Sequence, residues 1–491
     1  MTRRRFVAAT GAALAGAALP FARPARAARA ASVAVDADVA VRAFLTRPDL
    51  TPPAVTIATR TDAATPGLVF TAPFTGPGQH GPLIFDDSGE PVWFKPVSKA
   101  TAMNFRVQRY RDAPVLTWWE GQVDNGGYGG GTGVVVDRTY REIARVKAGP
   151  RLQSDLHEFV LTSRGTALIA IYSAITADLT SVGGPADGRL IEGVVQEIDI
   201  PSGRVLFEWH SFDHVGLDES NRGYPTEPGQ FDYFHLNSIG VDRDGHLLVS
   251  ARHTSTVYKV HRRTGAVIWR LGGKRNDFRL GPGAAFSFQH DARSHDDGTL
   301  TVFDNGASSP ADDVEGMSRP VRLALDSSAM TATLAQVYPI DPPRLAIAMG
   351  NVQQLPDGGA FVGWGTAGGC TEIGPDGSLR FDSRFTGNGW SYRALRHTWV
   401  GRPRIKPTVV TAADTATGGT TVHVSWNGAT DVAAWQIRAG ARRDGLAVVR
   451  TVARSGFETA ATVPQLTGYV AVTGLDGSGR ALGSSVPRSV V

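Results

Sequence analysis

Three histidines begin three copies of one repeated segment, and an imidazole can act as a nucleophile, an acid or base, or a metal ligand. The copies are HEFVLTSRGTALIAIY from His157, HLNSIGVDRDGHLLVSAR from His235 and HDARSHDDGTLTVFDNG from His290. Two further copies begin with an asparagine, at Asn104 and Asn351. Equivalent positions of a closed circular repeat face one common centre, so we expect the three imidazoles to converge.

A second set of polar residues recurs seven positions after the turn glycines that align the copies. These residues are Tyr172, Arg252 and Asn305. An arginine offers a planar fork that matches sulfate, phosphate or carboxylate, so the combined site suits an anionic ligand. Zinc held by the three histidines is the competing interpretation. No carboxylate is clearly spaced to support such a zinc site, since Asp291 directly follows His290 and should point to the opposite face of the strand.

Two tryptophans are candidates for binding an aromatic group. Trp119 and Trp364 stand near the channel ends of their predicted strands, where an indole could stack on an aryl ring. The strand neighbour of Arg252, His253, should point away from the site and have a structural role. We therefore place Tyr172, Asn305, Trp119 and Trp364 in the predicted substrate-binding set.

The elements that position these residues are short strands. Each copy contains two hairpins with period-2 apolar runs, which predicts a four-stranded antiparallel sheet. Six such units occupy residues 67–98, 104–148, 157–210, 235–271, 290–340 and 351–397. Six four-stranded units close into an all-β, six-bladed β-propeller, which leaves only short protected edges and a central channel.

The remaining segments divide the chain into further parts. Residues 31–66 are expected to form an N-terminal extension that packs on the propeller domain, residues 67–400. Residues 401–408 are rich in proline and arginine and predict a linker. Residues 409–491 contain closely spaced strands rich in Val, Thr and Trp, which fit a small fibronectin-III-like β-sandwich.

The first thirty residues predict an export signal. The run Thr2-Arg3-Arg4-Arg5-Phe6-Val7 has the pattern of a twin-arginine signal peptide and precedes an apolar, alanine-rich stretch. We expect the Tat export machinery as a partner, and a periplasmic, secreted or cell-surface protein. Subtracting the six arginines of this segment from the 50 basic side chains leaves 44 against 46 acidic ones. That balance argues against a nucleic-acid partner, and no later apolar run predicts a transmembrane segment.

Several segments resemble the bacterial arylsulfotransferase family, in its exported actinobacterial-type branch. The longest is DYFHLNSIGVDRDGHLLVSARHTSTVYKVHRRTGAVIWRLGG, residues 232–273. DLHEF (155–159), FSFQHDAR (286–293), VFDNG (302–306) and SYRALRHTWVGRP (391–403) match other parts of the family pattern.

The resemblance implies a six-bladed propeller that transfers sulfuryl groups without the nucleotide cofactor PAPS or any other cofactor. A phenolic sulfate ester would give its sulfuryl group to His290, and the sulfohistidine would pass it to an acceptor phenol in a ping-pong cycle. His235 and Arg252 would hold the sulfuryl oxygens, and His157 would serve as acid or base. From its position alone, Asn305 would bind an oxyanion or orient His290. A metal-dependent hydrolase or lyase using the three histidines, and a non-catalytic propeller that binds an anion, are the alternatives.

Overall fold

The computed structural model describes residues 41–124, 126–225, 229–307 and 317–490. The described chain is almost entirely strand, as the period-2 patterns predicted, and its four 3-10 helices have three residues each. They are η1 (Thr180–Val182), η2 (Ser211–Asp213), η3 (Leu217–Glu219) and η4 (Gly365–Ala367). None of the helices in these ranges has the length and apolar character needed to cross a membrane. The predicted signal peptide, residues 1–30, lies outside the described residues.

Six sheets of four or five strands make up the larger part of the molecule, and they are antiparallel except where the short β13 and β18 pair with β11 and β22. The first contains β27 (Ser391–His397), β2 (Leu68–Pro73), β3 (Leu83–Phe85) and β4 (Pro91–Phe94). The second contains β5 (Thr101–Tyr110), β6 (Ala113–Val123), β7 (Gly129–Val136) and β8 (Glu142–Val146). The third contains β9 (Phe159–Leu161), β10 (Thr166–Ala177), β11 (Gly188–Asp199) and β12 (Val205–His210), and β13 (Phe231–Asp232) pairs with β11.

The other three sheets repeat this order along the chain. The fourth contains β14 (Leu236–Val241), β15 (Leu247–Ala251), β16 (Thr256–Val260) and β17 (Val267–Gly272). The fifth contains β19 (His290–Ser294), β20 (Thr299–Asp304), β21 (Arg319–Asp326), β22 (Thr331–Val337) and the short β18 (Arg279–Leu280). The sixth contains β23 (Asn351–Gln354), β24 (Ala360–Gly363), β25 (Cys370–Ile373), β26 (Leu379–Phe385) and β1 (Val55–Arg60).

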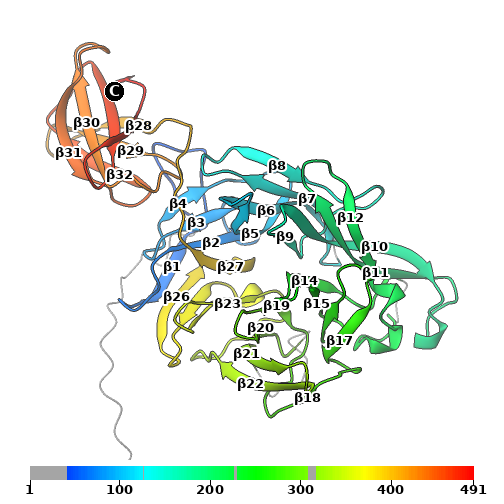
Figure 1. Ribbon diagram of the computed structural model, residues 1–491. Coiled ribbons are helices and arrows are strands. Elements are labelled where there is room, and N and C mark those ends of the chain that lie inside the picture. Colours follow the sequence, from blue (N-terminus) through cyan, green and yellow to red (C-terminus); the bar gives the residue numbers. More distant parts are fainter. Residues whose placement is uncertain (1–40, 125, 226–228, 308–316, 491) are drawn as a thin grey trace, which may run out of the picture.

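The sheets are arranged in a propeller-like ring around a common centre (Figure 1). Strands near the centre contact one another in a closed circle. β27 contacts β5, β5 contacts β9 of the third sheet, and β10 of that sheet contacts β14. β14 then contacts β19, β19 contacts β23, and β23 contacts β27. Neighbouring sheets share apolar cores: Leu168 and Val195 of the third sheet pack with Ile239 and Val249 of the fourth. Each sheet therefore buries both faces, which explains why its strands are apolar almost throughout.

The ring closes through a strand that the sequence pattern placed elsewhere. Residues 391–397 were predicted to belong to the sixth unit, but β27 pairs with β2, with Phe70 opposite Leu395. The first sheet thus combines strands from both ends of the ring, and its hydrogen bonds tie those ends together. The predicted N-terminal extension also joins the ring, because its strand β1 pairs with β26 and forms the outer strand of the sixth sheet.

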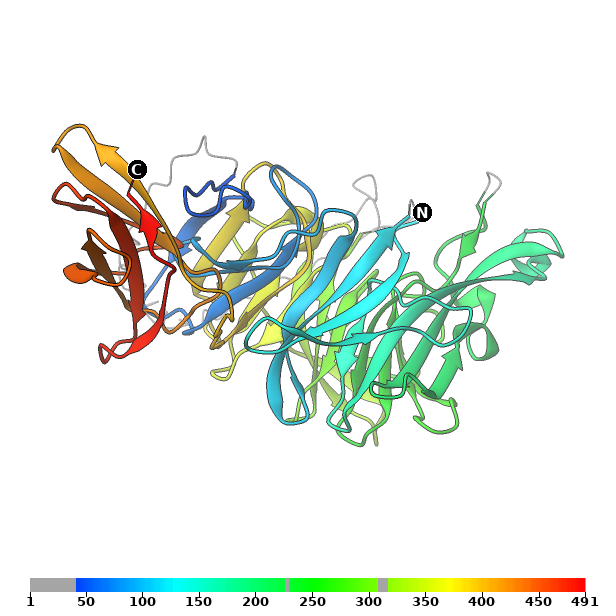
Figure 2. The ribbon, with the colours of Figure 1, turned by 90° about the horizontal axis from the view of Figure 1, so that it is seen from above.

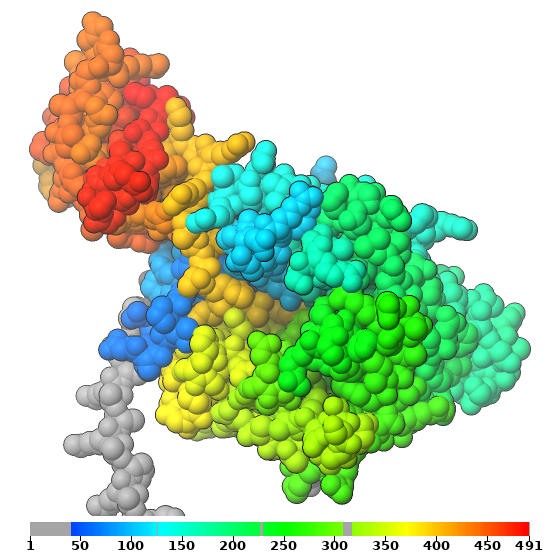
Figure 3. All heavy atoms as spheres, viewed as in Figure 1, coloured from blue at the N-terminus to red at the C-terminus, as the bar shows by residue number. Residues whose placement is uncertain are grey.

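The C-terminal residues form two smaller sheets around one apolar core that includes Val422, Trp435 and Val472. One contains β28 (Thr408–Asp414), β29 (Gly419–Ser425) and β32 (Glu458–Val463). The other contains β30 (Ala434–Gly440), β31 (Ala447–Ala453), β33 (Tyr469–Leu475), β34 (Ala481–Ser484) and β35 (Arg488–Ser489). Figures 2 and 3 show this module, in orange and red, beside one edge of the ring.

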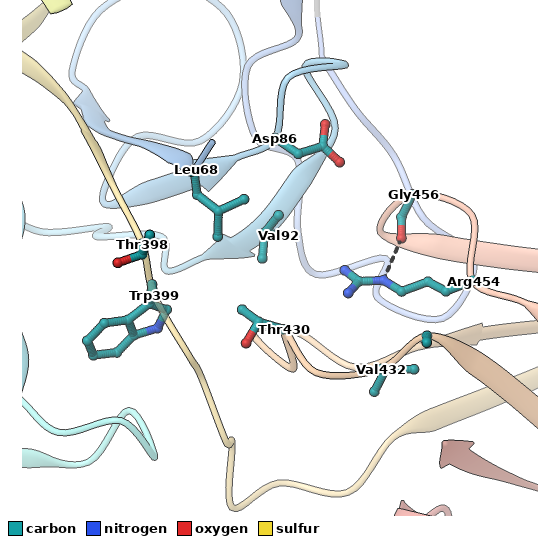
Figure 4. Close-up of a pocket in the computed structure, with 11 residues that line it drawn as sticks. Leu68, Asp86, Val92, Thr398, Trp399, Thr430, Val432, Arg454 and Gly456 are labelled. Atoms are coloured by element: carbon teal, nitrogen blue, oxygen red, sulfur yellow. Dashed lines mark hydrogen bonds between the residues drawn. The ribbon is translucent and has the colours of Figure 1, made fainter. Parts of the chain in front are cut away.

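The C-terminal module is joined to the ring by specific contacts with the first sheet. The Asn427 amide accepts a hydrogen bond from the Phe94 N–H at 3.0 Å and donates to the Phe94 carbonyl at 2.9 Å. A cavity of about 530 Å³ lies between Leu68 and Val92 of the ring and the module (Figure 4). Arg454 extends into this region and donates to the Gly456 carbonyl at 3.2 Å.

Candidate active site

The three repeated histidines meet at one end of the innermost strands. His157 and His235 lie just before β9 and β14, and His290 is the first residue of β19. The rings of His157 and His235 are 5.0 Å apart between centroids. All three histidines line one cavity of about 310 Å³ together with Arg252. The structure therefore brings the four predicted catalytic residues to a single site.

His290 is held in one tautomer by two hydrogen bonds. Its Nδ1 lies 2.7 Å from Oδ1 of Asn305, an oxygen that can only accept. The Asn305 amide is oriented by its Nδ2, which donates to the carbonyls of Ala346 at 2.6 Å and Met349 at 3.0 Å. The backbone N–H of Met349 donates to Nε2 of His290 at 3.2 Å. Nδ1 therefore carries the proton, and the unprotonated Nε2 accepts the Met349 N–H at the cavity wall.

The other two histidines of the site are each paired with a carboxylate. Nδ1 of His157 lies 2.5 Å from Oδ1 of Asp155, and Nδ1 of His235 lies 2.5 Å from Oδ2 of Asp232. The sequence-based expectation that no carboxylate supports these histidines was wrong, because the partners lie two and three residues earlier and the chain turns back before each histidine. A carboxylate at Nδ1 fixes the orientation of the ring. Asp291 does point away, as predicted, and pairs with Arg293.

Arg252 is positioned by the residue that follows it. Nη1 of Arg252 donates to Nε2 of His253 at 3.1 Å, and Nη2 donates to the Ile347 carbonyl at 2.9 Å. His253 can accept this bond because its Nδ1 donates to the backbone carbonyl of Asp232 at 2.7 Å. The ring of His253 also lies 4.5 Å from that of His235. His253 thus supports two residues of the site instead of pointing away from it.

Burial and neighbouring charge keep two of the histidines neutral. Burial, together with the positive charge of Arg252, holds the pKa of His290 well below its ordinary value. Burial also holds the pKa of His235 well below its ordinary value, and His157 and Arg252 lower it further. Asp232 has a raised pKa, mainly because it is buried. The site therefore offers a neutral nucleophilic imidazole beside a fixed positive charge.

Apolar and aromatic side chains form most of the remaining cavity wall. The larger ones are Phe74, Met103, Leu156, Met349, Trp390 and Tyr392. Tyr392 is tied to the ring by its hydroxyl, which donates to the Asn237 carbonyl at 2.9 Å. Its aromatic ring lies edge-on to His157, at 5.5 Å between centroids. A cavity with one polar, positively charged end and one apolar wall suits a molecule that joins an anionic group to an aromatic ring.

The structure places the predicted substrate-binding tryptophans outside the cavity lining. Trp119 is fully buried and donates from Nε1 to the Ser154 carbonyl at 2.9 Å. Trp364 is fully buried and donates to Thr371 Oγ1 at 2.8 Å. Tyr172 stacks on His157 at 5.2 Å between centroids and donates to the Leu236 carbonyl at 2.7 Å. Trp119 and Trp364 therefore pack behind the site, and Tyr172 supports His157 from outside the cavity lining.

The residues of this site lie in a part of the chain that matches a known protein family. The family model described as Arylsulfotransferase (ASST) matches residues 106–386, more than half of the chain. The chain belongs to the arylsulfotransferase family. The matched range contains His157, His235, Arg252 and His290, so the converging residues all lie within the family region of this arylsulfotransferase chain.

Solved structures that resemble this chain include two distant examples, and a comparison with curated proteins gave no match. A protein of unknown function from Bacteroides caccae is 14% identical, with a TM-score of 0.42 over 68% of this chain and 99% of that chain. Selenomethionine-substituted virginiamycin B lyase from Staphylococcus aureus is 10% identical, with a TM-score of 0.33 over 76% of this chain and 96% of that chain. Scores this low carry no conclusion about the activity of the chain.

Proposed function

We propose that this protein is a PAPS-independent aryl sulfotransferase that moves a sulfuryl group from a phenolic sulfate ester to a phenolic acceptor through a sulfohistidine on His290. The observation that carries the proposal is the unprotonated Nε2 of His290 at the wall of a cavity that also contains Arg252. Membership of the arylsulfotransferase family supports the same reaction class.

In the first half-reaction, the aryl ring of the donor packs on the apolar wall formed by Phe74, Met103 and Tyr392. The Nε2 lone pair of His290 gives up its hydrogen bond with the Met349 N–H and attacks the sulfur, and the bond between sulfur and the phenolic oxygen breaks. Arg252 stabilises the charge on the sulfuryl oxygens as a preorganised donor. His235, whose Nδ1 is held by Asp232, joins it from Nε2 when its ring takes up a proton. The leaving phenolate takes a proton from His157, whose orientation Asp155 fixes.

In the second half-reaction, an acceptor phenol occupies the same apolar wall. His157 takes the phenolic proton, and the phenolic oxygen attacks the sulfur of the sulfohistidine. The bond between Nε2 and sulfur breaks and restores neutral His290. Because donor and acceptor use one site in turn, the mechanism requires ping-pong kinetics.

We also propose how the chain divides into domains. Six sheets and a closed path of contacts between their innermost strands support a six-bladed propeller. The two sheets that share one core after residue 408 support a fibronectin-III-like sandwich. We further propose Tat-dependent export through residues 1–30, as in the actinobacterial-type branch, with the mature protein periplasmic, secreted or on the cell surface.

A metal-dependent hydrolase is less well supported by the contacts at the site. Among the described residues, the group with metal-ligand geometry is Asp232, His235 and His253, and not the three repeated histidines. The guanidinium of Arg252 lies 3.1 Å from His253 Nε2, so a cation there would meet a positive charge. Both ring nitrogens of His253 already take part in hydrogen bonds.

The proposed function is tested by incubating the purified protein with p-nitrophenyl sulfate and a phenolic acceptor. We expect p-nitrophenol release that depends on the acceptor, parallel double-reciprocal plots, and no loss of rate after treatment with a chelator. Absence of release with any phenolic acceptor would favour a non-catalytic anion-binding protein. Loss of activity on chelation and its return with zinc would favour the metal-dependent alternative.

Replacing Arg252 with glutamine should slow transfer strongly. The neutral amide cannot stabilise the charge that develops on the sulfuryl oxygens, so we expect kcat to fall by about 10²–10³. The matched control is Arg480→Gln, which changes an exposed arginine that pairs with Asp476 in the C-terminal module. Equal rates for the two variants would contradict the role assigned to Arg252.

The pH dependence should reflect the lowered pKa of His290. This imidazole reacts only when neutral, and its folded-state pKa lies well below 6.5 because it is buried beside Arg252. The burst of phenol in the first half-reaction should therefore stay constant as the pH falls through 6.5 and decline only at lower pH. Stopped-flow measurement of the burst rate checks this, and a midpoint at or above 6.5 would contradict it.

A further inference from the structure

A second cavity lies at the opposite end of the innermost strands. It has a volume of about 360 Å³ and is lined by residues that come later along the strands that form the active site. In β19, His290 lines the active site whereas Arg293 lines the second cavity. In β5, Met103 lines the active site whereas Arg106 lines the second cavity. The two cavities therefore occupy the two ends of one channel.

A buried ionic cluster separates the two ends. Glu158 directly follows His157 and is fully buried. It accepts from Arg106 at 2.6 Å, Arg293 at 2.5 Å and Arg393 at 3.1 Å. Asp291 adds a second carboxylate, 2.7 Å from Arg293 and 2.9 Å from Arg393.

The charges around the second cavity do not balance. Three arginines of the cluster line it, and Asp291 and Glu158 supply two carboxylates, which leaves an excess of one positive charge. Those arginines are Arg106, Arg293 and Arg393; a fourth, Arg109, is exposed to solvent. Burial lowers the pKa of Arg106 to about 10; Glu158 opposes this shift, and the neighbouring Arg293 and Arg393 add to it. Unbalanced buried charge is costly unless a counter-ion is bound.

Polar atoms beside this cavity are also left without partners. Within the described structure, Nε of Arg106, Nε2 of His397 and Oε1 of Gln354 are buried and make no hydrogen bond. All three side chains line the cavity. Burial and Arg106 lower the pKa of His397 to about 4, so its ring is neutral near pH 7 and can donate a single N–H. Two unused nitrogen donors beside a surplus positive charge form an arrangement suited to an oxyanion, whereas Gln354 Oε1 can only accept and would not bind it.

We propose that this second cavity binds a small oxyanion of the sulfate class, held chiefly by Arg106 and His397. The ligand would balance the surplus charge of the buried cluster and stabilise the ring, because Arg106 and His397 belong to β5 and the closing strand β27. The site does not depend on sulfuryl transfer, since it lies at the other end of the channel from His290.

The proposal is tested by thermal melting and calorimetric titration of the full chain with sodium sulfate, at constant ionic strength. Bound ligand should raise the melting temperature along a saturating curve, whereas a general salt effect rises without saturation. The test variant is Arg106→Lys with His397→Gln, which retains a positive charge facing Glu158. Arg252→Gln serves as the matched variant for the catalytic cavity.

We expect saturable binding in the parent protein and in Arg252→Gln, and binding at least tenfold weaker in the double variant. Phenol release by the double variant should stay at the parental rate, which shows that it is folded. Binding that survives in the double variant but is lost in Arg252→Gln would place the ion in the catalytic cavity and overturn the proposal. A non-saturating rise of equal size in all proteins would overturn it too.

Discussion

The His290→Asn variant is expected to lose sulfuryl transfer by a factor on the order of 10⁴ or more, because it removes the nucleophile itself. The asparagine side chain reaches about as far as Nδ1 of the imidazole. Its amide N–H can donate to Asn305 Oδ1 in place of Nδ1, so the fold should persist. The missing atom is Nε2, the nitrogen that faces the cavity. The measurement is phenol release from an aryl sulfate with saturating acceptor.

A matched control separates loss of the nucleophile from loss of a histidine in general. His261 lies in a hairpin turn and contacts Thr264, far along its sheet from the inner strands. The His261→Asn variant should keep the parental rate and melting temperature. If His290→Asn turned over at a comparable rate, His290 would not be the nucleophile.

The Glu158→Gln variant is expected to lower the free energy of unfolding by about 3–5 kcal/mol, the usual cost of removing one partner from a buried ion cluster. Glu158 is fully buried against three arginines, and a neutral amide cannot balance them. Burial alone would raise the pKa of Glu158, but Arg293, Arg393 and Arg106 hold it well below its ordinary value. This contribution to stability is present above the unfolded-state pKa and is lost as pH falls toward the folded value.

Chemical denaturation of the variant and the parent at pH 7 measures this effect. The control is Glu142→Gln, which removes an exposed ion pair with Arg145, 2.8 Å long. An exposed pair contributes about 0–1 kcal/mol, so the control should change little. Equal shifts for the two variants would mean that the buried cluster does not hold the ring together.

The repeat pattern was sufficient to predict the convergence of the catalytic residues. Turn glycines such as Gly245 and Gly298 align the copies, and the positions before and after each turn lie at fixed heights on the first two strands of a sheet. His235 and Arg252 are therefore brought to the same end of the channel as His290. Strand period and repeat register alone carry this information.

Irregular backbone explains what the sequence did not reveal at the site. His235 has a φ of +55°, so the chain turns sharply just before β14 and brings Asp232 back beside its ring. Arg252 and His253 follow the end of β15 at Ala251, so the rule that strand neighbours point to opposite faces does not apply to them. Period-2 reasoning fails in such segments because side-chain direction there depends on individual backbone angles.

Long-range pairing explains the remaining differences in the fold. β27 carries the apolar alternation of any inner strand, and its choice of β2 as partner depends on closure of the ring, which local sequence does not encode. Trp119 and Trp364 lie on strands that reach the channel, but both rings are turned into the packing between neighbouring elements. Apolar strands with two buried faces give no sequence signal for which face meets the ligand.

The central claim is that the sulfuryl group is carried on Nε2 of His290 between donor and acceptor. Its most direct test is mass spectrometry of the protein after incubation with an aryl sulfate and no acceptor, followed by peptide mapping. We expect one sulfuryl adduct on His290, which disappears when a phenol is added and is absent in His290→Asn. An adduct on another residue, or transfer without any adduct under single-turnover conditions, would contradict it.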